Sequence, residues 1–210
     1  IVPANTYIAT ILAILKSGHE PVLVEPCIET YNINPDEILR HLTNKTKAVL
    51  CVHLYGRPCD MDAILSICDE HSLHLLEDVA QAHGAKFRGK VVGSFGIGCH
   101  SFYPTKNLGA LGDGGAITLN DNCYNESLRK LRNYGSGVKY ENEVLGHNSR
   151  LDEIQALVLS RKLQILDCIN TKKRTLAEIY TTHLDDKFIK PKVDAEYYNV
   201  HHIYNIRHKK

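Results

Sequence analysis

Apolar runs and amphipathic segments alternate along the first 132 residues of the chain. Short runs rich in valine, leucine and isoleucine predict strands, whereas segments with apolar residues every three or four positions predict helices. The predicted strands are 21–25, 47–53, 73–77 and 115–119, and the predicted helices are 6–16, 34–42, 60–71 and 122–132. This alternation is typical of an α/β fold with a mostly parallel central sheet and helices on both faces.

Local signals support several of these boundaries. Gly18 provides a C-terminal stop for the first helix. Asn34 can cap the second helix, because Pro35 then occupies its first position, where a missing N–H is harmless. In the third helix Ile64 and Ile67 lie on one apolar face.

The second half of the chain is less regular. Residues 133–148 are polar and glycine-rich, which predicts a loop longer than most connections, and such loops are usually functional or disordered. Residues 151–184 predict one or two long helices, and residues 200–206 alternate as a strand does. We therefore expect a large domain over 1–150, connecting helices over 151–185, and the start of a small C-terminal domain over 186–210.

Composition excludes several classes of function. Apolar residues make up 43% and charged residues 23% of the chain, as in ordinary globular proteins, and the net charge of +1 predicts no nucleic-acid or membrane partner. No apolar run approaches the roughly 20 residues of a membrane span. The seven cysteines are scattered without a C-x-x-C pair, which favours reduced thiols in the cytoplasm. The twelve histidines form no H-E-x-x-H or similar cluster, so we expect no metal.

The strongest chemical signal is Lys106. It follows a short apolar run that Pro104 interrupts, and residues 108–115 directly after it contain four glycines. In a semi-enclosed site, burial would lower the pKa of this lysine and free a neutral amine to attack a carbonyl. An ordinary surface lysine beside a flexible loop is the alternative.

Two acids, Glu77 and Asp78, end the strand predicted upstream, and Gln81 and His83 follow them. Ligands of α/β sheets bind beyond the carboxyl ends of the strands, which places Asp78 beside a ligand. Either acid alone would more often cap a helix, but Asp78 together with Lys106 suits pyridoxal phosphate. The lysine would form a Schiff base with the cofactor, and the carboxylate would keep the pyridine nitrogen protonated.

Several motifs in one order resemble the sugar aminotransferases of the DegT/DnrJ/EryC1/StrS family, across nearly all 210 residues. The matching segments are Val2-Pro3-Ala4-Asn5-Thr6-Tyr7, Val52-His53-Leu54-Tyr55-Gly56, Glu77-Asp78, Ala80-Gln81-Ala82-His83-Gly84-Ala85, Ser101-Phe102-Tyr103-Pro104-Thr105-Lys106-Asn107, Gly112-Asp113-Gly114-Gly115, Arg132-Asn133-Tyr134-Gly135 and Gly146-His147-Asn148-Ser149-Arg150-Leu151-Asp152. The resemblance implies the large domain of a fold-type I enzyme dependent on pyridoxal phosphate. Relatives are longer at both ends, so we expect a truncated chain without the upstream helix N-terminus that binds most of the phosphate.

The resemblance also implies roles for individual residues near the cofactor. Lys106 is the expected catalytic lysine and Asp78 the partner of the pyridine nitrogen. Gln81 matches a glutamine near the 3-hydroxyl, and Ser101 matches a donor to the phosphate. Tyr7 matches an aromatic residue stacked on the ring. The alternatives are a solvated helix residue for Gln81, a turn residue for Ser101 and a core aromatic for Tyr7.

Three further residues complete the expected site. Asn148 matches an asparagine that reaches across a homodimer interface to the neighbour's phosphate, so the active sites would be composite. Arg150 is a candidate contact for an anionic substrate group, or a plain arginine at a helix N-terminus. His83 is a candidate sugar contact, or a packed histidine behind the site.

The implied activity is amino transfer, with glutamate as the expected donor, to a keto group of a nucleotide-linked deoxysugar. The Gln81-Ala82-His83-Gly84 segment resembles members that act at C3 of the sugar. Transfer at C4 or to a cyclitol is one alternative. A non-catalytic sensor that binds pyridoxal phosphate, or an inactive fragment, is the other, although Lys106 is present.

Overall fold

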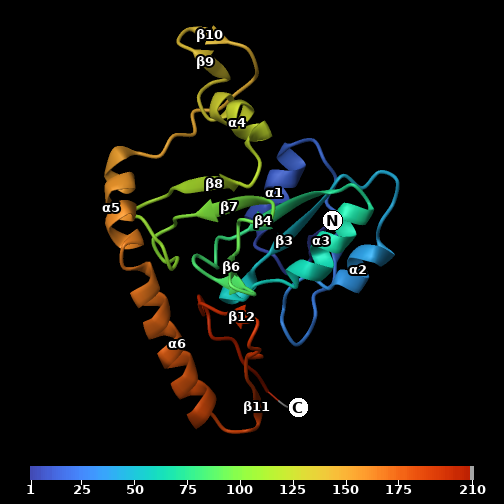
Figure 1. The fold of residues 1–210 in the computed structure, drawn as a ribbon, viewed down its shortest axis with the longest axis vertical. Helices are drawn as coiled ribbons and strands as arrows, with labels where there is room; N and C mark the ends of the chain where they lie inside the picture. Colours follow the sequence, from blue (N-terminus) through green and yellow to red (C-terminus); the bar gives the residue numbers. More distant parts are fainter. Residues whose placement is uncertain (209–210) are drawn as a thin grey trace.

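The centre of the fold is a four-stranded sheet, seen in a computed structural model that describes residues 1–208 (Figure 1). Its strands lie in the order β3-β4-β7-β8. Strands β3, β4 and β7 are parallel and β8 is antiparallel to β7. They span Ala48–Val52, His74–Asp78, Ile97–Ser101 and Gly115–Leu119, respectively. The mostly parallel α/β sheet expected from the sequence is confirmed.

A two-stranded parallel pair extends this sheet beside β3. Strand β1 (Val2–Pro3) pairs with β2 (Leu23–Val24). The Leu50 amide donates to the Ile1 carbonyl at 2.9 Å, which joins β1 to β3. Strands β1, β3, β4 and β7 therefore direct their carboxyl ends toward a common edge.

Three short helices follow the first strands and begin as expected. Helix α1 spans Ile8–Lys16, α2 spans Pro35–Arg40 and α3 spans Met61–Glu70. The Asn34 side chain accepts from the Asp36 amide and so caps α2, as its sequence predicts. Ile64 and Ile67 of α3 pack with Val49 and Leu75 of the sheet in the main core.

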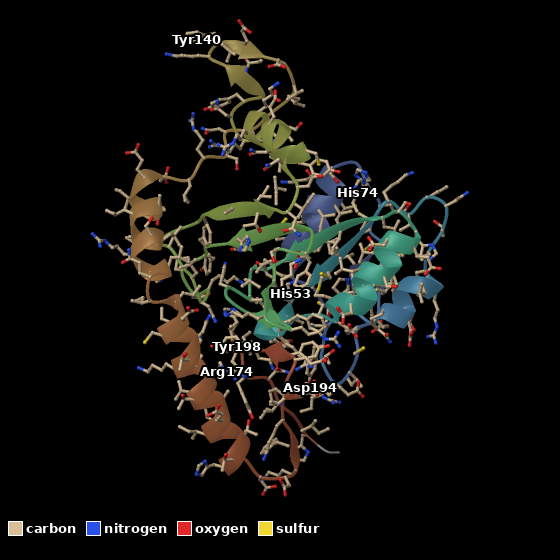
Figure 2. The ribbon with its side chains drawn as sticks, in the orientation of Figure 1. His53, His74, Tyr140, Arg174, Asp194 and Tyr198 are labelled. Carbon is tan, nitrogen blue, oxygen red and sulfur yellow. The ribbon has the colours of Figure 1, made fainter. Side chains whose placement is uncertain are left out.

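The segment that the sequence predicts as a long loop contains an ordered hairpin. The hairpin consists of β9 (Ser136–Val138) and β10 (Glu141–Asn142). It follows the short helices η2 (Asn122–Tyr124) and α4 (Asn125–Leu131). A bridge between Asn133 and Asn148 closes its base. We call residues 133–150 the arm. It projects from one end of the molecule, with Tyr140 at its tip (Figure 2).

Two helices, α5 (Glu153–Leu163) and α6 (Leu166–His183), run along one side of the molecule in succession (Figure 1). The remaining short strands are β5 (Lys86–Phe87), β6 (Lys90–Val91), β11 (Phe188–Ile189), β12 (Tyr197–Tyr198) and β13 (Arg207–His208). Among the described residues no helix is both long and apolar enough to cross a membrane.

Part of the segment 186–208 packs against the rest of the molecule, and the expectation that residues 186–210 begin a small C-terminal domain stays a prediction. Strand β12 pairs with β5 of the body, and Val200 is fully buried. The Val200 amide also donates to the Gly56 carbonyl, in η1 (Leu54–Gly56), at 2.9 Å. Residues 200–206 do not form the strand that their alternation predicts; the Ile203 amide donates to the Tyr55 carbonyl of the same turn at 3.5 Å.

Candidate active site

A cavity of about 740 Å³ opens at the carboxyl ends of the parallel strands, where the sequence places the site. Lys106, Asp78, Gln81, Ser101 and Tyr7 all line it. Residues separated by up to 99 positions thus meet because β1, β4 and β7 end at one edge of the sheet.

Lys106 occupies a tight, self-supporting loop on the wall of this cavity. Its amide donates to the Tyr103 carbonyl at 2.9 Å, and the Ala110 amide donates to the Phe102 carbonyl at 2.7 Å. A Cβ on Gly109 would lie 2.4 Å from the Pro104 carbonyl oxygen, so this glycine permits close approach. Partial burial lowers the pKa of Lys106 from 10.5, although Asp78 acts in the opposite direction.

The Asp78 carboxylate is held by two neutral donors. Oδ1 accepts from the Ala80 amide at 3.0 Å, and Oδ2 accepts from the Thr10 hydroxyl at 2.8 Å. Among residues 1–208 the carboxylate forms no ion pair. Thr10, on α1, was not a candidate from the sequence; its position inside an apolar helical pattern is the signal that could have shown it.

Gln81 is attached to the turn after β3. Its Oε1 accepts from the Tyr55 amide at 2.7 Å, and Tyr55 has a φ of 58°, which is uncommon for a residue other than glycine. This bond fixes the side chain, and Gln81 lines the cavity. Gln81 is therefore a positioned cavity residue, not a freely solvated one.

Ser101 and Tyr7 lie on other walls of the cavity. The Ser101 hydroxyl accepts from the Tyr103 amide at 3.4 Å, a weak local bond that leaves its own O–H free to donate. Tyr7 is the N-cap of α1 and is 70% exposed. The alternative of a core aromatic for Tyr7 is therefore wrong.

His83 does not line the cavity in the structure, which favours the alternative of a packed histidine behind the site over a sugar contact. The ring is buried and packs against both His100 and Phe102, at centroid distances of 5.6 and 5.7 Å, in a cluster of three aromatic rings. Burial, with His100 and Lys106 nearby, lowers the pKa of His83 to about 3. The tight turn after β4 turns this neutral ring into the interior, behind the site.

Asn148 and Arg150 are not at the cavity of their own chain. Both are exposed at the base of the arm, and Arg150 lies over the Tyr134 ring at 5.2 Å. Its guanidinium also donates to the Asn133 side chain at 3.4 Å. Within one chain these residues belong to the arm and not to the site.

Three buried side chains of types that can bind metal ions lie close together, those of Cys51, His53 and Cys59. Their possible ligand atoms lie within 4.8 Å of one another. Both ring nitrogens of His53 are already engaged. Nδ1 accepts from the Cys59 amide at 3.0 Å, and Nε2 donates to Glu77 at 3.1 Å. The arrangement is a hydrogen-bonded core cluster, and the expectation of no metal stays a prediction.

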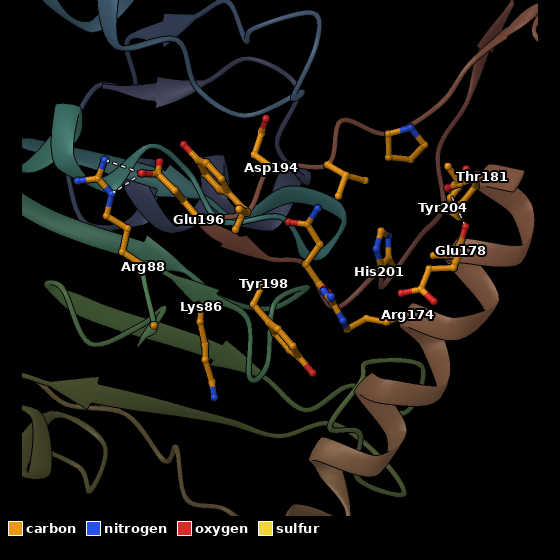
Figure 3. Close-up of a pocket in the computed structure, with 17 residues that line it drawn as sticks. Lys86, Arg88, Arg174, Glu178, Thr181, Asp194, Glu196, Tyr198, His201 and Tyr204 are labelled. Atoms are coloured by element: carbon orange, nitrogen blue, oxygen red, sulfur yellow. Dashed lines mark hydrogen bonds and ion pairs between the residues drawn. The ribbon is translucent and has the colours of Figure 1, made fainter.

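A second cavity, of about 480 Å³, lies between α6 and the β5–β12 pair (Figure 3). The Tyr198 ring lies there under the Arg174 guanidinium, at 4.2 Å. Lys106, Asp78 and Ser101 do not line this cavity. It is therefore separate from the candidate active site.

The profile of the DegT/DnrJ/EryC1/StrS aminotransferase family matches residues 1–210. The chain belongs to this family. It is 54% identical, over 211 aligned residues, to a dTDP-3-amino-3,6-dideoxy-alpha-D-galactopyranose transaminase from Aneurinibacillus thermoaerophilus, covering 100% of the chain and 58% of the relative. The chain thus spans little more than half the length of this relative.

Two solved structures of family type share the fold. DesV from S. venezuelae, in complex with a ketimine intermediate, has a TM-score of 0.95 and 44% identity, over 99% of this chain and 57% of DesV. The ntda protein of Bacillus subtilis, with bound cofactor PMP, has a TM-score of 0.89 and 30% identity, over 99% of this chain and 49% of ntda. Both likenesses agree with the fold-type I large domain expected from the sequence.

Proposed function

We propose that this protein is an aminotransferase dependent on pyridoxal phosphate. It would transfer the amino group of an amino acid, with glutamate as donor, to the C3 keto group of a nucleotide-linked deoxysugar. The observation that carries the proposal is that Lys106, on the loop after β7, and Asp78, at the end of β4, line one cavity. The 3-amino sugar in the name of the Aneurinibacillus relative supports the choice of C3.

The cavity residues fit this cofactor. Among the described residues the Lys106 ammonium has no hydrogen-bond or ion-pair partner, and its lowered pKa favours the nucleophilic neutral amine. Asp78 has only neutral donors and so can accept from a cationic ring nitrogen. Tyr7 offers an exposed ring for stacking, and Ser101 a free O–H for the phosphate.

When bound, the cofactor supplies an electron sink for breaking a bond at the substrate's amino carbon. Asp78 would keep the ring nitrogen protonated, and Thr10 would hold the carboxylate in place from behind. Lys106 would bind the cofactor aldehyde through its amine, and after release would carry the proton to and from the substrate carbon. Gln81, fixed by Tyr55, would donate to the ring hydroxyl.

The site is proposed to be completed by a second copy of the chain. Asn148 and Arg150 are exposed on the arm, away from their own cavity, where they can face a neighbour. The arm also carries apolar side chains in open solvent, with Tyr140 87% and Leu145 92% exposed, as expected for a surface that a partner covers. A symmetric dimer would supply each site twice.

The test uses the full-length protein loaded with pyridoxal phosphate. Borohydride reduction followed by peptide mass analysis is expected to place the cofactor on Lys106 and to find none on the exposed Lys47. In a separate, unreduced sample, glutamate should remove the yellow absorbance, and a 3-keto nucleotide sugar should restore it. Attachment to another lysine would exclude this site.

The same experiment separates the alternatives. A 4-keto nucleotide sugar or a keto-cyclitol that restores the absorbance more efficiently than the 3-keto sugar would favour those substrates. If the cofactor is attached to Lys106 but no amino donor changes its absorbance, the protein would be a sensor that binds the cofactor without catalysis.

A further inference from the structure

A single buried asparagine, Asn170 of α6, touches both loops that carry the proposed chemistry. Its Oδ1 accepts from the side-chain amide of Asn107 at 2.9 Å, and its Nδ2 donates to the His83 carbonyl at 2.9 Å. Asn107 directly follows Lys106, and His83 lies five residues after Asp78. One side chain therefore connects the lysine loop to the aspartate loop.

The position of Asn170 is unusual for its residue type. It is 0% exposed, on the helix face that otherwise buries Leu166 and Ala177. A polar side chain there is costly unless both ends of its amide are hydrogen-bonded, and here both are. Gly84 leaves the necessary space, because a Cβ at this glycine would lie 2.8 Å from Nδ2 of Asn170.

The two loops that Asn170 joins are each internally rigid. Between Val79 and Ala85 backbone hydrogen bonds close two successive turns. The Ala82 amide donates to the Val79 carbonyl at 2.9 Å, and the Ala85 amide donates to the Ala82 carbonyl at 3.0 Å. The Lys106 loop is closed by its own backbone bonds to Tyr103 and Phe102. A link between two rigid loops sets the separation of the groups that they carry.

Asn107 extends the same connection to the C-terminal segment. Its side-chain amide also donates to the Val200 carbonyl at 3.0 Å. Asn107, the residue after the lysine, is thus hydrogen-bonded both to α6 and to the C-terminal segment. Asn107 is itself buried. Removal of Asn170 would leave the Asn107 amide with one acceptor, and would leave the His83 carbonyl without its side-chain donor.

We propose that Asn170 is a positioning residue, which sets the distance between Lys106 and Asp78 by bridging Asn107 and His83. The proposal rests on the function proposed above. Asn170 acts through the two loops and does not line the cavity. Its loss should therefore misplace the lysine relative to the ring site without removing any group that contacts the substrate.

The experiment compares Asn170→Ala with Asn199→Ala in the full-length protein. Asn199 is also buried, but its side chain faces Lys192 and contacts neither loop. The readouts are the dissociation constant of pyridoxal phosphate from the apoprotein, kcat, the KM for the keto sugar and Tm. Because a misplacement of about 1 Å can cost up to about 10²-fold, Asn170→Ala should weaken cofactor binding and lower kcat by at least about tenfold.

The KM for the sugar should change little in Asn170→Ala, and Asn199→Ala should keep cofactor affinity and kcat even where Tm falls equally. Asn107→Ala should also weaken cofactor binding and lower kcat, and the double variant should lose less than the sum of the two single variants, since either one removes the bond between Asn107 and Asn170. Equal losses in Asn199→Ala, or additive losses in the double variant, would overturn the proposal. If Asn170→Ala does not fold, Asn107→Ala and the Asn199 control decide.

Failure of the proposed function is distinguishable from failure of this inference. Wild-type protein that forms no borohydride-trapped adduct at Lys106 would reject the function. An adduct at Lys106 together with unchanged cofactor affinity and kcat in Asn170→Ala would reject only the positioning role.

Discussion

The Glu77 carboxylate accepts a hydrogen bond from Nε2 of His53 at 3.1 Å, and both side chains are fully buried. The same carboxylate accepts from the amides of Gly93, Phe95 and Gly96 at 2.7 to 2.8 Å. Burial alone would raise the pKa of Glu77, but the bonds from His53 and from the amides hold it below 4.5. Glu77 directly precedes Asp78, and its carboxylate thus connects the end of β4 to His53, after β3, and to the 93–96 loop.

Glu77→Gln should destabilise the protein by about 2 kcal/mol or more, because an amide NH₂ would face buried donors that now meet a carboxylate oxygen. Chemical denaturation measures the effect. Glu126→Gln is the control, since Glu126 is exposed and pairs only with Lys130 at the surface; its unfolding should match the wild type. Equal stability of both variants would contradict a structural role for the Glu77 network.

The contribution of the Glu77 carboxylate to the stability of the protein should decrease as the pH falls. A carboxyl whose folded pKa lies below its unfolded value stabilises the protein above the unfolded pKa, here about 4.5, and loses this contribution as the pH falls through the folded pKa. The stability difference between wild type and Glu77→Gln should therefore be largest at neutral pH and shrink below pH 4.5. A difference that grows on acidification would reject this explanation.

Asp78→Asn removes charge from the proposed site with little change of shape. The amide oxygen can still accept from the Ala80 amide, and the Thr10 hydroxyl can reverse to accept from the new NH₂. We expect turnover to fall by at least about 10²-fold, as for loss of an acid–base contribution, with Tm little changed. Thr10→Val, which removes only the supporting hydroxyl, should have a smaller effect. Near-normal turnover of Asp78→Asn would mean that another group faces the ring nitrogen.

Gly56 allows the C-terminal segment to dock on the turn after β3. Its φ is +88°, and a Cβ there would lie 2.9 Å from the amide nitrogens of His201 and His202. Gly89 is the matched control, because its φ is +80° but a Cβ would meet nothing within 4 Å. Both alanine variants carry the strain of a positive φ, about 1 kcal/mol. Gly56→Ala should lose clearly more stability in denaturant unfolding, and equal losses would show that the docking contact is unimportant.

The sequence predicts the body of the fold because its signals there are local. Apolar periodicity and the Asn34 cap correctly predict the helices, and the acids at the end of β4 correctly predict which edge of the sheet holds the cavity. The arm was predicted as a loop, since strands of two or three polar residues leave no period-two pattern.

Residues that act over long sequence separations could not be found in this way. Thr10 meets Asp78 across 68 positions and Asn107 meets Asn170 across 63, so each reads locally as an ordinary helix or loop residue. For a related reason the sequence leaves both interpretations of His83 open, a sugar contact and a packed histidine. Which side of a tight turn faces the cavity depends on packing against His100 and Phe102, which the sequence does not reveal.

The composite site makes a prediction that two inactive variants can test together. Lys106→Ala removes the reactive amine, and Asn148→Ala removes the arm residue expected to reach the neighbour's cavity. If the arm serves the other subunit, a mixed dimer has one site with both native residues and one with neither. Mixing the two full-length variants should then restore up to about a quarter of wild-type activity, since half the dimers are mixed at random exchange and each has one working site.

The control for this experiment is a variant pair that damages one site from within the same chain, Lys106→Ala with Asp78→Asn. Both residues line one cavity of one subunit, so mixing these two variants leaves no site intact and should restore nothing. Subunit exchange is verified beforehand with differently tagged copies. Recovery in the first mixture and not in the second supports the cross-subunit role. No recovery in either mixture, despite exchange and with Asn148→Ala inactive alone, would show that the cross-subunit role of Asn148 is wrong.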